Sequence, residues 1–151
     1  MHDREPEPLR DILERLFVRY LGVRPGGFEL EKGAPLEPVI EARILGFGPA
    51  RTLYKKQRPD CRSLDAVQSI THRERRCAEC SLRERCTPQV RLDLVVDAQS
   101  YRLLLAYTSA RSFLAYVAEL QRRAIPLDRV RHRILVVDRR TFGELRFSAL
   151  D

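Results

Sequence analysis

The 151-residue chain has no tryptophan, one methionine and three histidines, and only three of its 28 basic residues are lysine. The histidines are far apart, and neither H-E-x-x-H nor G-x-S-x-G occurs. A phosphate-binding glycine loop is also absent from the sequence. We therefore expect a binding protein and not an enzyme.

Long apolar runs are missing as well. No window approaches the roughly 18 apolar residues of a membrane span. The first ten residues, MHDREPEPLR, are charged and contain no apolar run. The length fits one domain, residues 1–151, which can bury about two-thirds of the surface of the unfolded chain. We therefore expect a soluble, cytoplasmic protein that does not contact a membrane.

Four cysteines lie in one polar stretch with the spacing C-x15-C-x2-C-x5-C. They are Cys61, Cys77, Cys80 and Cys86. A buried free cysteine normally lies among apolar residues, and structural disulfides are rare in reducing compartments. A C-x2-C pair lets two sulfurs converge on one ion, and a second pair completes a tetrahedral four-thiolate site. We therefore predict structural Zn²⁺, with free or disulfide-bonded cysteines as an alternative.

An iron-sulfur cluster is a further alternative. A distant cysteine followed by C-x2-C-x5-C resembles the cluster-binding pattern of iron-sulfur nucleases in the RecB-like superfamily. The resemblance implies a 4Fe-4S cluster on the same cysteines. Those nucleases also need a Glu-x-Lys motif, and no glutamate precedes Lys32, Lys55 or Lys56 by two positions. We therefore expect such a cluster only in a non-catalytic protein.

Apolar residues recur with helical period near the N-terminus. Over residues 9–21 they are Leu9, Ile12, Leu13, Leu16, Phe17 and Tyr20. Charged residues lie on the opposite face, and Gly22 follows the last of the pattern. The pattern predicts an amphipathic helix that packs on the core or docks onto a larger protein complex.

The remaining periodicity predicts five strands and one helix. The expected strands are 38–47, 90–97, 100–108, 130–138 and 141–150, and the expected helix is 109–124. Residues 48–90 show no sustained period. This order, with a helix between the third and fourth strands, is that of the OB-fold. We therefore predict a mainly β, α+β fold: an OB-like five-stranded barrel over 38–150 with a metal-binding element inserted at 58–90.

The segments CRSLDAVQS, CAEC, CTPQVRLDLVV and YRLLLAYTSARSFLAYVAEL resemble small phage- and plasmid-associated proteins that carry a four-cysteine insertion. Those proteins are regarded as single-stranded DNA-binding-like, with OB-type folds. The similarity spans roughly residues 58–137. It implies metal binding by Cys61, Cys77, Cys80 and Cys86, and a helix that begins near Thr108 or Ser109.

Positive charge is concentrated around the cysteines, because residues 51–91 hold eleven basic and five acidic residues. Arginine grips phosphate, and aromatic rings stack on unpaired bases. The candidate contacts are Arg43, Arg51, Tyr54, Lys55, Lys56, Arg58, Arg75, Arg76, Arg91, Tyr101 and Tyr107. Tyrosines at strand ends also commonly cap a barrel. We predict single-stranded nucleic acid, DNA in preference to RNA, as the partner, with a protein-interaction subunit of a nucleic-acid-processing complex as the alternative.

Overall fold

The computed structural model describes residues 18–72 and 75–150. The five predicted strands and the helix between the third and fourth are present in the predicted order. They are β4 (Val39–Lys55), β6 (Thr87–Val96), β7 (Gln99–Leu105), α2 (Tyr107–Arg122), β8 (Arg131–Asp138) and β9 (Gly143–Leu150). The prediction of a mainly β, α+β fold is therefore confirmed.

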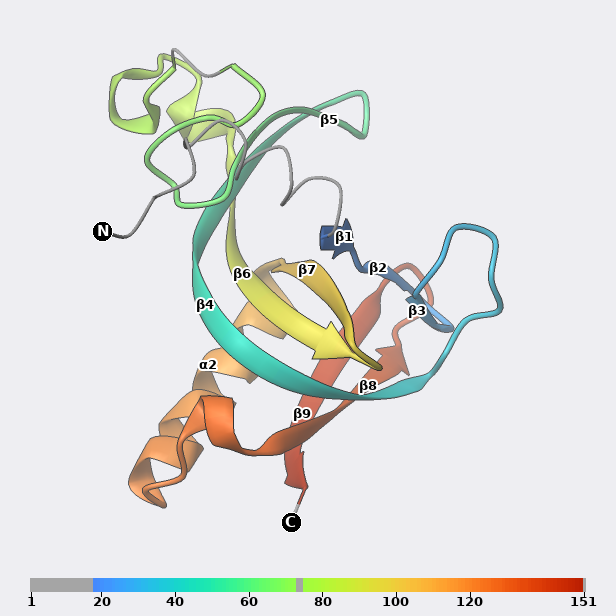
Figure 1. Ribbon diagram of the computed structural model, residues 1–151. Coiled ribbons are helices and arrows are strands. Elements are labelled where there is room, and N and C mark those ends of the chain that lie inside the picture. The colour runs from blue at the N-terminus through green and yellow to red at the C-terminus, as the bar shows by residue number, and fades with distance from the viewer. Residues whose placement is uncertain (1–17, 73–74, 151) are drawn as a thin grey trace, which may run out of the picture.

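The prediction of a closed barrel is wrong. The main sheet has the order β1-β7-β6-β4-β8-β9. Of the five predicted strands, β7 and β9 are the outermost, and they are not hydrogen-bonded to each other. A small hairpin, β2 (Gly22–Arg24) and β3 (Gly27–Glu29), occupies this region (Figure 1). A Cβ atom on Gly143, the first residue of β9, would lie 2.7 Å from the Arg24 carbonyl oxygen. The close approach of β2 therefore requires glycine at the start of β9.

The predicted N-terminal helix is wrong where the structure describes it. Val18–Tyr20 form strand β1, which pairs in parallel with Ser100–Arg102 of β7. The backbone N–H of Leu21 extends this pairing by donating to the Arg102 carbonyl at 2.8 Å. Pairing with an available sheet edge overrides a local helical period. Residues 9–17 of the predicted helix lie outside the described residues.

Strand β4 continues eight residues past its predicted end, and β5 (Arg58–Ser63) pairs back onto it. Part of the predicted insertion is therefore sheet. Register shifts between Ile44 and Gly46, and between Leu53 and Tyr54, interrupt the regular pairing of β4 with its neighbours. Such bulges hide the strand period in the sequence. The described irregular part of the insertion is reduced to residues 64–72 and 75–86, with 3-10 turns η1 (Cys77–Glu79) and η2 (Arg83–Arg85).

The core is enclosed by the main sheet, α2 and the β2-β3 hairpin, whose Phe28 is fully buried in it. Phe113 of α2 is fully buried, and its ring makes edge contacts with Phe47 of β4 and Phe147 of β9, with centroids 5.1 and 5.2 Å away. The helix therefore covers strands on both sides of β8. In the described part of the chain, no helix is long and apolar enough to cross a membrane.

Candidate nucleic-acid interface and metal centre

The β4-β5 hairpin and the cysteine insertion lie at the same end of the molecule, away from the C-terminus (Figure 1). The insertion begins with a tight turn around Asp65. One carboxylate oxygen of Asp65 accepts hydrogen bonds from the N–H groups of Val67 and Gln68 and from the Ser63 hydroxyl. Burial alone would raise the pKa of Asp65, but these hydrogen bonds lower it below 3.8. An ionised Asp65 therefore directs the chain back across β5.

The sheet register positions the first and last cysteines. Cys61 on β5 lies opposite Leu53 of β4, and Thr87, the residue after Cys86, lies opposite Thr52 on the other side of β4. The two cysteines therefore flank the same part of one strand. The middle cysteines share one turn, because the Cys80 N–H donates to the Cys77 carbonyl at 3.3 Å.

All four thiols are free and partly buried. Cys61 Sγ lies 3.1 Å from the Ser69 hydroxyl oxygen, and Cys86 Sγ donates to the Leu82 carbonyl at 3.7 Å. Burial raises the pKa of Cys86, and the charges of Cys61, Cys80 and Cys77 raise it further, whereas the Arg51 guanidinium lowers it. Cys86 is therefore near enough to the other three thiols to interact with them electrostatically.

Within residues 18–72 and 75–150, no three histidine, cysteine, aspartate or glutamate side chains are grouped so that they could hold a metal ion. The structure brings the four predicted ligands into one small region without bringing three of them into coordination. The zinc site therefore stays a prediction.

Cationic side chains gather at the tip of the β4-β5 hairpin. Lys55 pairs with Arg58 across a two-residue turn, and both turn residues have left-handed backbones, Lys56 with φ 50° and Gln57 with φ 64°. This is the geometry expected of a type I′ turn, which normally selects Asn-Gly. Lys55 Nζ lies 3.5 Å from an Asp60 carboxylate oxygen in an exposed ion pair. Lys56 and Arg58 are exposed beside it.

Tyr54 adjoins this tip, and its side chain is 43% exposed. Its hydroxyl accepts a hydrogen bond from Gln89 Nε2 of β6 at 3.3 Å. The hydroxyl end of the tyrosine is therefore attached to the sheet, while part of the ring is accessible to solvent.

The other two predicted tyrosines differ from Tyr54 and from each other. Tyr101 is only 5% exposed, and its hydroxyl donates to the Leu30 carbonyl at 3.4 Å. It belongs to the core and presents no free face to a base, so we withdraw it as a candidate contact. Tyr107 is 72% exposed, but it begins α2, where the Arg111 guanidinium lies 5.5 Å from its ring centroid.

Two predicted arginines bind the insertion to the sheet. Arg51 Nη1 donates to the Arg83 carbonyl at 3.5 Å. Arg91 donates to the Leu64 carbonyl and forms an ion pair with Asp93 at 3.3 Å. Arg91 thus contacts Leu64, the first residue of the irregular segment, and Arg51 contacts Arg83, close to the last cysteine. Both arginines therefore hold the insertion against the sheet.

The remaining predicted arginines are exposed. Arg75 and Arg76 lie in the insertion, whereas Arg43 lies between Val95 and Arg131 in the half of β4 that is far from the hairpin tip. The structure therefore groups Arg75 and Arg76, but not Arg43, with the positive end of the molecule.

Tyr20 is a candidate contact that sequence reasoning missed. It is 46% exposed on β1, and the Arg62 guanidinium of β5 lies 4.7 Å from its ring centroid. Arg62 is the cross-strand neighbour of Thr52, two residues before Tyr54. Tyr20 was assigned to the apolar face of a predicted helix, and nothing local in the sequence pairs it with Arg62.

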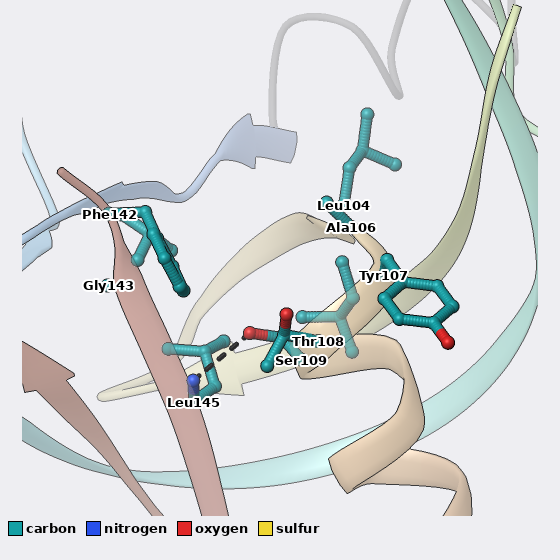
Figure 2. Close-up of a pocket in the computed structure, with 10 residues that line it drawn as sticks. Leu104, Ala106, Tyr107, Thr108, Ser109, Phe142, Gly143 and Leu145 are labelled. Atoms are coloured by element: carbon teal, nitrogen blue, oxygen red, sulfur yellow. Dashed lines mark hydrogen bonds between the residues drawn. The ribbon is translucent and has the colours of Figure 1, made fainter. Parts of the chain in front are cut away.

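A separate groove of about 350 Å³ lies where the sheet is open. Its wall includes Leu104, Phe142 and Leu145, and all ten lining residues are uncharged. In Figure 2, the Ser109 hydroxyl accepts a hydrogen bond from the Leu145 N–H at 3.1 Å, and Tyr107 and Phe142 lie on opposite sides of the groove. An uncharged groove is unsuited to phosphate, so we place the candidate interface at the hairpin and the insertion.

Comparison with known proteins gives no further guide. No protein-family model matches the chain, and neither a curated protein nor a solved structure is similar to it.

Proposed function

We propose that this chain is a non-catalytic protein that binds single-stranded nucleic acid, DNA in preference to RNA. The observation that carries the proposal is the hairpin tip, where the exposed ring of Tyr54 adjoins Lys55, Lys56 and Arg58. Sequence-tolerant binding of single strands combines ring stacking on bases with cations along the phosphates. Arg75 and Arg76 add positive charge in the neighbouring insertion.

We further propose that Cys61, Cys77, Cys80 and Cys86 hold a structural Zn²⁺. The donor set is four free thiols, of which Cys86 interacts electrostatically with the other three, and four thiolates are a ligand set that structural zinc prefers. Four thiolates without a metal would repel each other, and a bound Zn²⁺ would replace that repulsion with attraction. Zinc binding would thereby supply folding free energy to this segment, because residues 64–72 and 75–86 contribute no residue to the apolar core. A 4Fe-4S cluster on the same cysteines is the alternative.

The binding proposal is tested by fluorescence anisotropy of labelled oligothymidylate over a range of salt concentrations. We expect the affinity to fall with a log-log slope of roughly 0.7 per phosphate neutralised. Replacing Lys55, Lys56 and Arg58 together by glutamine should weaken binding and reduce the slope by about two. The matched control replaces Arg122, Arg123 and Arg129, near the C-terminal end of α2, by glutamine. It should change the affinity and the salt slope less than the hairpin variant does.

Three outcomes contradict this proposal. An affinity that does not depend on salt would exclude phosphate contacts. Equal effects of the two triple variants would show that the phosphate contacts are not located at the hairpin tip. An absence of binding at micromolar protein in low salt would favour the alternative, a protein-interaction subunit that docks onto a larger nucleic-acid-processing complex.

The metal proposal is tested by elemental analysis of protein purified without chelators. We expect one zinc per chain, and we expect Cys80→Ser to lose it. Ser81→Ala is the control, because Ser81 is exposed beside Cys80 and its substitution removes no thiol. A brown protein that contains iron would establish the cluster, and wild-type protein with neither metal would exclude both.

A further inference from the structure

Three side chains from two strands form a hydrogen-bonded chain that ends at Tyr54. The Thr52 hydroxyl donates to Gln89 Oε1 at 2.7 Å, and Gln89 Nε2 donates to the Tyr54 hydroxyl at 3.3 Å. Each polar atom has a distinct role, because an amide offers an acceptor on one side and donors on the other. We call this chain the Thr52-Gln89-Tyr54 relay.

Burial increases along the relay from the surface inward. Tyr54 is 43% exposed, Gln89 is 9% exposed, and Thr52 has no exposed surface. A buried amide that lacked partners would carry a large desolvation cost, so both of its hydrogen bonds strongly favour one orientation. Thr52 pairs across the strands with Thr87, two residues before Gln89, and this register sets the distance between Thr52 and Gln89. The Tyr54 hydroxyl is therefore hydrogen-bonded to a buried part of the sheet.

We propose that Thr52 and Gln89 are positioning residues that hold the Tyr54 ring as a stacking platform for one unpaired base. The inference rests on the proposed function and adds to it the ligand group that Tyr54 receives. Immobilising a side chain on binding costs free energy, and a ring that is already oriented avoids most of that cost. A hydroxyl fixed at one end leaves the ring face for stacking, which needs no hydrogen bond to the base.

A base within a duplex is already stacked on both sides and must be unstacked before it can reach such a platform. The relay therefore favours single strands over duplex of the same sequence. The probe is an oligonucleotide that contains 2-aminopurine, a fluorescent adenine analogue, and its duplex with the complement.

The decisive variant is the double substitution Thr52→Val, Gln89→Leu. It removes the amide that holds Tyr54 and also removes the threonine hydroxyl, so it leaves no buried donor without a partner. Tyr54→Ala removes the stacking ring itself. Gln121→Leu, at an exposed position of α2, is the matched control. Urea unfolding of each variant identifies any general loss of stability.

For wild-type protein we expect binding to quench 2-aminopurine in the single strand. Tyr54→Ala should weaken binding about tenfold and remove the quenching. The double variant should weaken binding about three- to tenfold, reduce the quenching at saturation and leave the salt slope unchanged. In the Tyr54→Ala background the double substitution should have no further effect on affinity, because its residues act through that ring.

If wild-type protein binds the oligonucleotide, two results would overturn the relay alone. The double variant could bind as tightly as wild-type protein, or the double substitution could reduce the affinity equally in the wild-type and Tyr54→Ala backgrounds. Wild-type protein that does not bind would overturn the proposed function and the stacking role together. A 3-fluorotyrosine label at position 54 tests the positioning without ligand. Its ¹⁹F resonance should sharpen or shift toward that of a free ring in the double variant, and an unchanged resonance would overturn the relay.

Discussion

His132 Nδ1 lies 2.6 Å from the Tyr116 hydroxyl oxygen, and His132 Nε2 lies 2.8 Å from the Leu127 carbonyl oxygen. A carbonyl only accepts, so Nε2 carries the proton and Nδ1 of the neutral ring accepts from the tyrosine. His132 is fully buried, and burial also raises the pKa of Tyr116 to about 12. The pair joins α2 to β8 through two neutral groups.

We expect the stability of the protein to fall as the pH drops below about 6.5. Burial lowers the pKa of His132 from 6.5, while a hydrogen bond to Leu127 opposes the shift. In this pH range the unfolded chain takes up a proton that the folded chain resists, so the free energy of unfolding decreases until the lowered pKa is reached. Urea unfolding at pH 7.5 and 5.5 measures the difference.

His132→Gln should flatten this pH dependence, because it removes the titrating ring. A wild-type free energy of unfolding that is constant between these pH values would contradict the assignment of a neutral His132.

The sequence predicted the strands and the helix whose side chains alternate or repeat regularly against one core. Ile40, Ala42 and Ile44 follow the expected alternation, and all three are buried. The prediction of β4 ended at Phe47, shortly after the bulge that follows Ile44, although the strand itself continues to Lys55. A local period cannot identify a strand across a bulge, because the partner strand that defines the register is distant in sequence.

The candidate site was predictable only in part for the same reason. The cysteine spacing indicated the insertion, and Tyr54 with its neighbouring cations was predicted as a candidate contact, but the sequence did not predict that these residues form the tip of a hairpin. Tyr101 and Tyr107 stand only six residues apart, yet one lies in the core and the other on the surface. Gln89 and Arg62 have no sequence signature, since their roles depend on contacts made across the sheet with Tyr54 and Tyr20.

Arg51 should control the reactivity of Cys86. Burial and the neighbouring thiols raise the pKa of Cys86, and the positive charge of Arg51 lowers it. Arg51→Gln removes that charge, so the thiolate fraction at pH 8 should decrease and alkylation of metal-free protein at Cys86 by iodoacetamide should slow about two- to threefold. Peptide mass spectrometry over time measures the rate at each cysteine.

Lys56→Gln removes an exposed charge at the hairpin tip and serves as the control, with an unchanged rate at Cys86. Faster alkylation in Arg51→Gln would show that the loss of the hydrogen bond to Arg83 exposes the thiol more than the charge activates it.

Gln57→Gly should stabilise the protein without altering its binding. Gln57 has φ 64°, a left-handed conformation that costs a non-glycine residue roughly 1–2 kcal/mol. The greater flexibility of glycine in the unfolded chain offsets part of the gain, so we expect about 0.5 kcal/mol in the free energy of unfolding. Ala98→Gly, at φ 65° in the β6-β7 turn, should give a similar gain. A loss of oligonucleotide affinity in Gln57→Gly would imply that the side chain itself contacts the ligand.

Tyr20 and Arg62 should contribute to binding in separable ways if nucleic acid extends from the hairpin tip across β5. Tyr20→Leu removes a stacking ring and should weaken oligonucleotide affinity about threefold or more without changing the salt slope. Arg62→Met keeps much of the side-chain volume but loses the charge, so it should weaken binding and reduce the slope by roughly 0.7. Phe142→Leu, an exposed aromatic at the separate uncharged groove, should have no effect. Anisotropy titrations at several salt concentrations distinguish these cases, and an effect of Phe142→Leu as large as that of Tyr20→Leu would move the interface toward the groove.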